Sequence, residues 1–348
     1  MAAGGGASAA GGGGGAAASS WPAGAATGLG SLPGTDIVEA TRLVFGELPD
    51  LPHLPELPAR GAGADMIGRS AALLVDLPVE ICPSGWRLTT HPGRELRRAR
   101  DFLARDLDAL AEAADGYAGA LKIQVAGPWT LACGVELPSG HRAVTDPGAV
   151  RDLAASLAEG VAAHLAEVSR RVPGAHVVAQ FDEPWLPAVL AGAVPTASGY
   201  GTVRSVEAVV AEAVLREVLA VAPAGGRVAH CCAANAPIAL LRAAGADAVS
   251  LDAALLTEAD YDALGEAIES GMRLWLGVLP ATDAAIGFGS ARELIHRLWD
   301  ALGFPRSSLA ATVVPTPACG LAGASAGHAR RALAVVRDIG RALRDESA

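Results

Sequence analysis

Short apolar runs alternate along this chain with longer segments in which apolar residues recur at helical spacing. Runs rich in Val, Leu, Ile and Ala predict buried strands, and their alternation with helices predicts βα units around a parallel sheet. The predicted strands are 26–34, 71–78, 120–128, 176–184, 227–232, 247–252, 273–280 and 311–320. The clearest helices between them are 150–172, 205–222, 236–245 and 291–302.

Eight strands that alternate with helices predict a single (β/α)8 barrel. An open doubly wound sheet would need a glycine-rich phosphate turn after an early strand, and no G-x-G-x-x-G motif lies there. The predicted fold class is therefore α/β, with a TIM barrel over residues 23–345. Residues 1–22, mostly Gly and Ala, are interpreted as a disordered low-complexity tail.

Composition narrows the function classes. The formal net charge is −10, whereas nucleic-acid binding requires clustered Lys and Arg. No run reaches the ~18 continuous apolar residues of a membrane span. The N-terminus has neither the basic start nor the Leu-rich core of a signal peptide, and five cysteines in a chain of 348 residues indicate a reducing compartment. We therefore expect a cytoplasmic protein that binds neither nucleic acid nor membrane.

The stretch "AHCCAAN" (229–235) carries the strongest chemical signal. Side chains alternate along a strand, so His230 and Cys232 share one side and Cys231 points the other way, as an inert packing thiol. Alone, this is a strand end with small thiols or half of a metal site. Cys319, at the end of another predicted strand, favours the metal site, because zinc binds imidazole and thiolate. Asp252 either adds an oxygen ligand or is a polar strand terminus.

Two adjacent acids end an apolar run in "QFDEPWL" (180–186). Buried ionised carboxylates are costly without partners, so simple packing explains this pair poorly. In a structural interpretation, one acid caps the next helix and the other pairs with an arginine. In the functional interpretation, Asp182 binds a substrate ammonium group and Glu183 makes internal hydrogen bonds.

The turn in "GLGSLPGTD" (28–36) has two glycines and a serine ahead of a proline. Backbone N–H groups at Gly30 and Ser31 can approach an anion closely there, as in a carboxylate-binding nest. A carboxylate-binding turn, an ammonium-binding acid and a thiol-binding metal together suit an amino acid that bears a thiol.

Six motifs carry a resemblance that extends from about Thr27 to the C-terminus. In chain order they are "GSLPGT", "GPWTLA", "QFDEP", "HCC", "DAVSLD" and "PACGL". At these residues the sequence resembles the catalytic C-terminal half of cobalamin-independent methionine synthase. Its superfamily also holds uroporphyrinogen decarboxylase and the methylcobamide:coenzyme M methyltransferases.

The resemblance implies a zinc ion (Zn2+) held by His230, Cys232, Asp252 and Cys319. The family's acid is usually glutamate and lies slightly further along the chain than Asp252 does. The resemblance also implies that Ser31 and Asp182 contact the carboxylate and the amino group of homocysteine. The family glutamate that assists at the amine has no clear counterpart near "RGAGADMIG", and Glu56 is the candidate considered for it.

Other departures concern the methyl donor. Full-length family enzymes carry an additional N-terminal barrel where this sequence has a Gly/Ala tail. The tryptophan that stacks on the folate soon after the G-P-x-T motif is missing, although Trp129 lies inside the motif itself. The likeness to short, single-barrel relatives implies a methyl-corrinoid, free or protein-bound, as donor, and methyltetrahydrofolate stays open as the alternative.

Three hypotheses follow from the sequence. The first is a zinc-dependent S-methyltransferase that makes methionine from homocysteine, with Asp182 as a catalytic residue that also binds the substrate and with Gly30, Ser31 and Glu183 at the substrate as well. The second is a corrinoid-dependent methyltransferase that acts on another thiol. The third is a non-catalytic zinc-binding barrel that binds a thiol amino acid.

Overall fold

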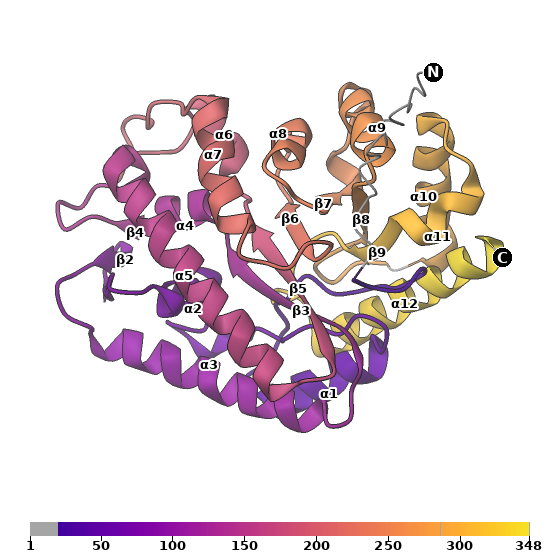
Figure 1. Ribbon diagram of the computed structural model, residues 1–348, viewed down its shortest axis with the longest axis horizontal. Coiled ribbons are helices and arrows are strands. Elements are labelled where there is room, and N and C mark those ends of the chain that lie inside the picture. Colours follow the sequence, from indigo (N-terminus) through magenta and orange to yellow (C-terminus); the bar gives the residue numbers. More distant parts are fainter. Residues whose placement is uncertain (1–19, 286, 348) are drawn as a thin grey trace, which may run out of the picture.

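A curled parallel sheet with the strand order β3-β5-β6-β7-β8-β9 forms the centre of the molecule (Figure 1). The computed structural model describes residues 20–285 and 287–347. The strands are Gly119–Ala126 (β3), Ala175–Asp182 (β5), Arg227–Cys231 (β6), Ala248–Asp252 (β7), Arg273–Leu279 (β8) and Val313–Pro317 (β9). All neighbouring pairs are parallel, so six of the eight predicted strands and the α/β class are confirmed.

Helices surround the sheet (Figure 1). They are α1 (Ile37–Glu47), α2 (Met66–Leu73), α3 (Arg94–Ala113), α4 (Pro128–Gly134), α5 (Pro147–Arg171), α6 (Leu186–Ala191), α7 (Ala208–Leu219), α8 (Ile238–Ala243), α9 (Tyr261–Glu269), α10 (Phe288–Leu302), α11 (Leu309–Thr312) and α12 (Ala326–Ser347). Helices α5, α7, α8 and α10 confirm the four helices predicted from periodicity. Within residues 20–285 and 287–347, none of the helices has the length and apolar character needed to cross a membrane.

Short elements complete the chain. A small separate sheet has the order β1-β2-β4 and consists of Val79–Cys82 (β1), Gly85–Leu88 (β2) and Val135–Glu136 (β4). The 3₁₀ helices are Pro58–Arg60 (η1), Ala143–Thr145 (η2), Ala253–Leu255 (η3), Glu258–Asp260 (η4) and Arg306–Ser308 (η5).

Local sequence explains where the principal helices begin. The Asp36 carboxylate accepts the backbone N–H groups of Val38 and Glu39 at 2.9 and 3.1 Å, which caps α1. Asp146 caps α5 in the same way, and Pro147 follows it at the first helical position, where its missing N–H costs nothing.

The two remaining predicted strands differ from the prediction. Residues 71–78 are the end of α2 and the loop after it, so the strand predicted there is wrong. The run begins with Ala71 and Ala72, which favour a helix, and α2 is capped by Asp65, whose carboxylate accepts the N–H of Gly68 at 2.8 Å. Residues 26–34 contain no regular strand, only an isolated bridge between Ser31 and Glu56.

Extended segments nevertheless continue the sheet at both edges. Beside β3, Leu54 N–H donates to the carbonyl of Lys122 at 2.9 Å, and Lys122 N–H donates to the carbonyl of Pro52 at 2.9 Å. Beside β9, Thr27 N–H reaches the carbonyl of Pro315 at 3.4 Å. The prolines of "LPHLPEL" (51–57) hide this extended segment in the sequence, because prolines are rare within sheets.

Side chains on the inner face of the sheet form an apolar layer towards the N-terminal ends of the strands. The layer takes one residue from each strand and three from the preceding chain: Ala120, Val178, Val228, Ala248, Trp275, Val314, Trp21, Ala25 and Leu51. Two residues further along every strand except β8, the same face carries a polar side chain: Lys122, Gln180, His230, Ser250 and Thr316. Polar chemistry therefore begins above this layer and faces the C-terminal ends of the strands.

The predicted tail, residues 1–22, lies largely outside the described residues. At its end, Trp21 is buried and packs against Trp275, with ring centroids 5.2 Å apart and planes at 79°. Trp21 is therefore part of the apolar layer and not of a tail.

Candidate metal and substrate site

Three predicted metal ligands meet at the C-terminal end of the sheet. His230 lies in β6, Cys232 directly follows β6, and Cys319 follows β9. One ligand atom from each lies within 4.8 Å of the others. Among the described residues, only these three His, Cys, Asp or Glu side chains form such a group. The structure thus brings together residues that are 87 positions apart in the chain.

The alternation of the strand sets their direction. Cys231 is 1% exposed and points away from the cluster, and burial raises the pKa of its thiol to about 11. Its sulfur is not among the three ligand atoms that meet in the cluster. The meaningful spacing in "HCC" is therefore His230 to Cys232.

Contacts within the cluster prepare it to bind a cation. Nδ1 of His230 lies 3.0 Å from the hydroxyl of Ser250, on the neighbouring strand β7. The sulfur atoms of Cys232 and Cys319 lie 3.3 Å apart. This contact lowers the pKa of Cys319 to about 4 and raises that of Cys232, because one thiol stabilises the other as a thiolate and then resists losing its own proton. The pair therefore carries one negative charge readily.

A cavity of about 280 Å3 opens beside the cluster. It is lined by Leu29, Ser31, Glu56, Pro58, Met66, Asp182, Pro184, His230, Cys232, Cys319 and Gly320. The thiols, the serine of the predicted carboxylate-binding turn and the aspartate of "DEP" therefore share one space.

Asp182 and Glu56 provide two buried carboxylates in this cavity, each 7% exposed. Asp182 accepts a hydrogen bond from Nε2 of Gln180 at 2.7 Å, and Glu56 accepts one from Nε2 of Gln124 at 3.1 Å. Arg69 approaches Glu56 at 3.5 Å. Burial raises the pKa of Asp182 to about 7, and the Coulombic effect of His230 opposes the rise. Sequence reasoning reached Glu56 only as a candidate, because its segment has no strand pattern.

Ser31 is held against the loop that carries Cys319. Its carbonyl accepts the N–H of Leu321 at 2.8 Å, and a Cβ at Gly320 would lie only 2.1 Å from its Oγ. Gly30 has φ +128°, and a Cβ there would meet the side chain of Gln124 at 2.8 Å. Both glycines are thus required by close approach at the cavity wall.

Glu183 has a different role from its neighbour. It is fully buried, and its carboxylate accepts hydrogen bonds from Trp129 N–H at 3.0 Å and from the N–H and hydroxyl of Thr130, both at 2.8 Å. These groups begin α4, whose own N-cap residue, Gly127, has no side chain to offer. A Cβ on Gly127 would lie 2.4 Å from the Glu183 carboxylate. Glu183, which directly follows β5, therefore caps the N-terminus of α4 and lies outside the cavity lining.

Asp252 lies at the end of β7. Its Oδ1 accepts the N–H of Ala254 at 2.9 Å and so caps η3. Burial raises the pKa of Asp252, and among the smaller effects are those of Cys319 and His230. Asp252 is thus near the cluster but outside the group of three. Its role as a fourth ligand stays a prediction.

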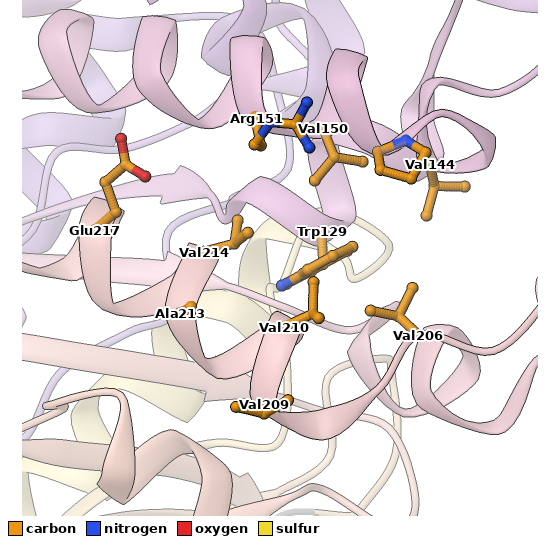
Figure 2. A pocket seen from close by; sticks show the side chains of 11 residues that line it. Trp129, Val144, Val150, Arg151, Val206, Val209, Val210, Ala213, Val214 and Glu217 are labelled. Atoms are coloured by element: carbon orange, nitrogen blue, oxygen red, sulfur yellow. The ribbon is translucent and has the colours of Figure 1, made fainter.

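A second cavity, of about 390 Å3, lies between α4, α5 and α7. Figure 2 shows the indole of Trp129 with Val206, Val210 and Val214 around it. The indole N–H donates to the carbonyl of Ala211 at 3.1 Å. Trp129 therefore faces an apolar space away from the cysteines and does not line the first cavity.

A family model described as "Cobalamin-independent synthase, Catalytic domain" matches residues 24–342. The chain belongs to this family. The family's description gives no support to the corrinoid donor considered from the sequence. A comparison with curated proteins found no match.

Solved structures show the same fold. One is a B12-independent methionine synthase from Shewanella sp. W3-18-1 in complex with selenomethionine, with a TM-score of 0.62 and 13% sequence identity. The alignment covers 93% of this chain and 98% of that one. GH5_18 structures from Bifidobacterium longum subsp. infantis (TM-score 0.47, 12% identity, 93% and 80% covered) and Streptomyces cattleya (TM-score 0.46, 16% identity, 95% and 82% covered) are more distant and carry no argument about fold or function.

Proposed function

We propose that this chain is a zinc-dependent S-methyltransferase that transfers a methyl group to the thiol of homocysteine and forms methionine. The observation that carries the proposal is the shared cavity: His230, Cys232 and Cys319 face the same space as Asp182 and Ser31. Membership of the cobalamin-independent synthase family supports it. So does a similar structure solved in complex with selenomethionine, the selenium counterpart of the product.

The cluster fits zinc by its donor set. One imidazole and two thiolates are the ligands that zinc prefers, and three protein ligands leave a position for a substrate. Ser250 holds Nδ1 of His230, so Nε2 is the nitrogen that would bind the metal. The hydrogen bond from Ala254 occupies Oδ1 of Asp252, so Oδ2 is the oxygen that would serve as a fourth ligand. When bound, zinc would stabilise the substrate's thiolate at neutral pH and so supply a nucleophile.

The other cavity residues would orient the amino-acid end of homocysteine. Asp182 and Glu56 would bind its ammonium group, and the turn at Ser31 would receive its carboxylate. These contacts fix the substrate at both charged groups and aim its sulfur at the cysteine side of the cavity. After methyl transfer the sulfur is a neutral thioether, which binds a thiophilic cation less well, so the product leaves.

The extended segments at the two edges of the sheet fit this function. We propose that residues 26–32 and 52–56 stand in the two remaining barrel positions, between β9 and β3. The hydrogen bonds of Thr27 to β9 and of Leu54 to β3, together with the bridge between Ser31 and Glu56, support this closure. Closure puts Ser31 and Glu56 at the C-terminal mouth, where barrel enzymes keep their catalytic groups.

Zinc analysis and a donor panel test the proposal. Wild type should retain stoichiometric zinc and make methionine from homocysteine with methyltetrahydrofolate, the donor favoured by membership of a cobalamin-independent family. The His230→Ala protein should lose both zinc and turnover. Methylcobalamin and coenzyme M serve as the alternative donor and the alternative thiol.

Two results would contradict the proposal in different ways. Zinc-free protein with full activity would remove the metal from the mechanism. Calorimetric homocysteine binding without turnover from any donor would assign the chain to the non-catalytic thiol-binding class.

A further inference from the structure

A lysine lies buried directly beneath the substrate cavity. Lys122, on β3, is the only lysine of the chain, beside 26 arginines, and it is 0% exposed. Its Nζ donates to Oε1 of Gln180 at 2.8 Å and to Oε1 of Gln124 at 3.0 Å. Lysines are almost never fully buried without partners, and here the partners are two neutral amides.

Lys122 determines which way both amides face. A side-chain amide has an oxygen that accepts and a nitrogen that donates, so an ammonium group at the oxygen turns the NH2 group to the opposite side. Nε2 of Gln180 then donates to Oδ1 of Asp182 at 2.7 Å and to the carbonyl of Leu29 at 3.0 Å. Both hydrogen bonds from Nε2 of Gln180 therefore depend on the amide orientation that Lys122 fixes.

The second amide repeats the arrangement. Nε2 of Gln124 donates to Oε1 of Glu56 at 3.1 Å and to the carbonyl of Leu54 at 2.7 Å. One ammonium group therefore orients two amides, and each amide holds one of the two carboxylates in the cavity. The network spans β3, β5 and the segment at 52–56, and it reaches the cavity wall through Asp182 and Glu56.

We propose that Lys122 is a positioning residue that sets the two cavity carboxylates, Asp182 through Gln180 and Glu56 through Gln124, to receive the ammonium group of the substrate. The inference rests on the proposed function, which supplies an amino-acid substrate. It goes further by assigning the recognition of the amine to a network that the substrate does not touch.

Charge and shape both explain why this position holds lysine. Burial lowers the pKa of Lys122 to about 7, while Asp182 and Glu56 raise it. The buried charge is therefore maintained by the carboxylates that it orients. A guanidinium group is larger and planar, and would not place one donor between two amide oxygens as a compact ammonium group does.

Binding of two ligands distinguishes a loss of amine recognition from general damage to the cavity. Homocysteine and 4-mercaptobutyrate share the thiol and the carboxylate, but 4-mercaptobutyrate has no amino group. Wild-type zinc-loaded protein should bind homocysteine more tightly than 4-mercaptobutyrate in calorimetry. The Lys122→Met protein should lose about tenfold in affinity for homocysteine, as expected when an oriented charge-assisted contact is lost, and keep its affinity for 4-mercaptobutyrate.

Variants of the two amides keep the test decisive if Lys122→Met does not fold. Gln180→Met and Gln124→Met each remove one branch and should each reduce the preference for homocysteine in part, with zinc content unchanged. Thr316→Val is the matched control: its hydroxyl is buried in the same polar layer without a hydrogen-bond partner among the described residues, so the preference should not change.

The outcomes separate the inference from the function on which it rests. Wild-type protein that shows no preference for homocysteine would contradict the proposed substrate. A wild-type preference that survives in Lys122→Met and in both glutamine variants would overturn the role of Lys122 alone. A uniform loss for both ligands would also overturn it, because it would show a merely structural effect.

Discussion

The sulfur atoms of Cys232 and Cys319 lie 3.3 Å apart, although β6 and β9, which these residues follow, are separated by two other strands. In a flat sheet, strands three positions apart would be about 14 Å from each other. The short distance therefore results from the curl of the sheet. The candidate metal site therefore depends on the whole fold and not on one local motif.

Replacing Cys319 with serine tests the cluster directly. A hydroxyl is a much poorer zinc ligand than a thiolate. Even the loss of a residue that only hydrogen-bonds to a zinc ligand lowers zinc affinity by about ten- to a hundredfold. We expect zinc affinity in Cys319→Ser to fall by about a hundredfold or more, measured by competition with a chromophoric chelator. Cys231→Ala is the matched control and should bind zinc as wild type does. Equal losses in both variants would mean that the cluster is not the zinc site.

The close approach of Gly320 to Ser31 predicts an energetic coupling. A methyl group at residue 320 would lie 2.1 Å from Oγ of Ser31, so Gly320→Ala should lower the free energy of unfolding by about 1–3 kcal/mol. The same substitution in a Ser31→Ala background should cost much less. Urea denaturation of the four proteins measures the coupling, and additive effects would contradict the contact. Gly265→Ala, in helix α9 with open space at its Cβ, should be neutral or stabilising.

Glu183 should matter for stability more than its position beside Asp182 suggests. Glu183→Ala leaves the N–H groups of Trp129 and Thr130 buried without their acceptor, so the free energy of unfolding should fall by about 3 kcal/mol. Glu266→Ala removes an exposed acid that pairs with Arg242, and it should change the free energy of unfolding by less than about 0.5 kcal/mol. Similar values for the two variants in urea denaturation would refute the capping role.

Acid should destabilise the fold through buried histidines. Burial lowers the pKa of His164 to about 4 from its ordinary value of 6.5, because the folded state disfavours the charged imidazole. The unfolded chain binds the proton more readily, so this contribution to stability is complete above pH 6.5 and is lost as the pH falls towards 4. The loss is about 3 kcal/mol.

A variant series checks the assignment to His164. Chemical denaturation between pH 7 and pH 4 should show a shallower fall in His164→Leu than in wild type. His53, whose pKa burial also lowers, should leave a residual slope. His176→Gln replaces an exposed histidine and should retain the wild-type slope. An unchanged slope in His164→Leu would place the acid sensitivity elsewhere.

The sequence predicts most of the sheet because a strand covered on both faces must be apolar along its length. That rule identified all six strands but failed at 71–78, where an apolar run of Ala and Leu ends a helix. It also missed residues 52–56, whose prolines hide an extended segment that bonds to β3. Local composition cannot distinguish a helix end from an extended segment, because the difference lies in the hydrogen-bond partners of the backbone.

The site shows the same division. His230, Cys232 and Cys319 could be predicted because all three stand at strand ends, which parallel strands bring to one mouth. The network of Lys122 could not, because a lysine within "ALKIQVAGP" becomes informative only when Gln124 and Gln180 are seen to receive its hydrogen bonds. The role of a polar residue inside a sheet depends on its hydrogen-bond partners, which come from other strands and are not visible in the local sequence.

The capping of α4 by Glu183 makes the motifs "GPWT" and "DEP" depend on each other. "GPWT" supplies the backbone donors and the glycine that leaves room, and "DEP" supplies the acceptor, 53 residues further along. A relative that loses the acid gains nothing by keeping glycine at residue 127. Change at one motif should therefore be accompanied by change at the other, and an engineered graft of either motif succeeds only when both are transferred.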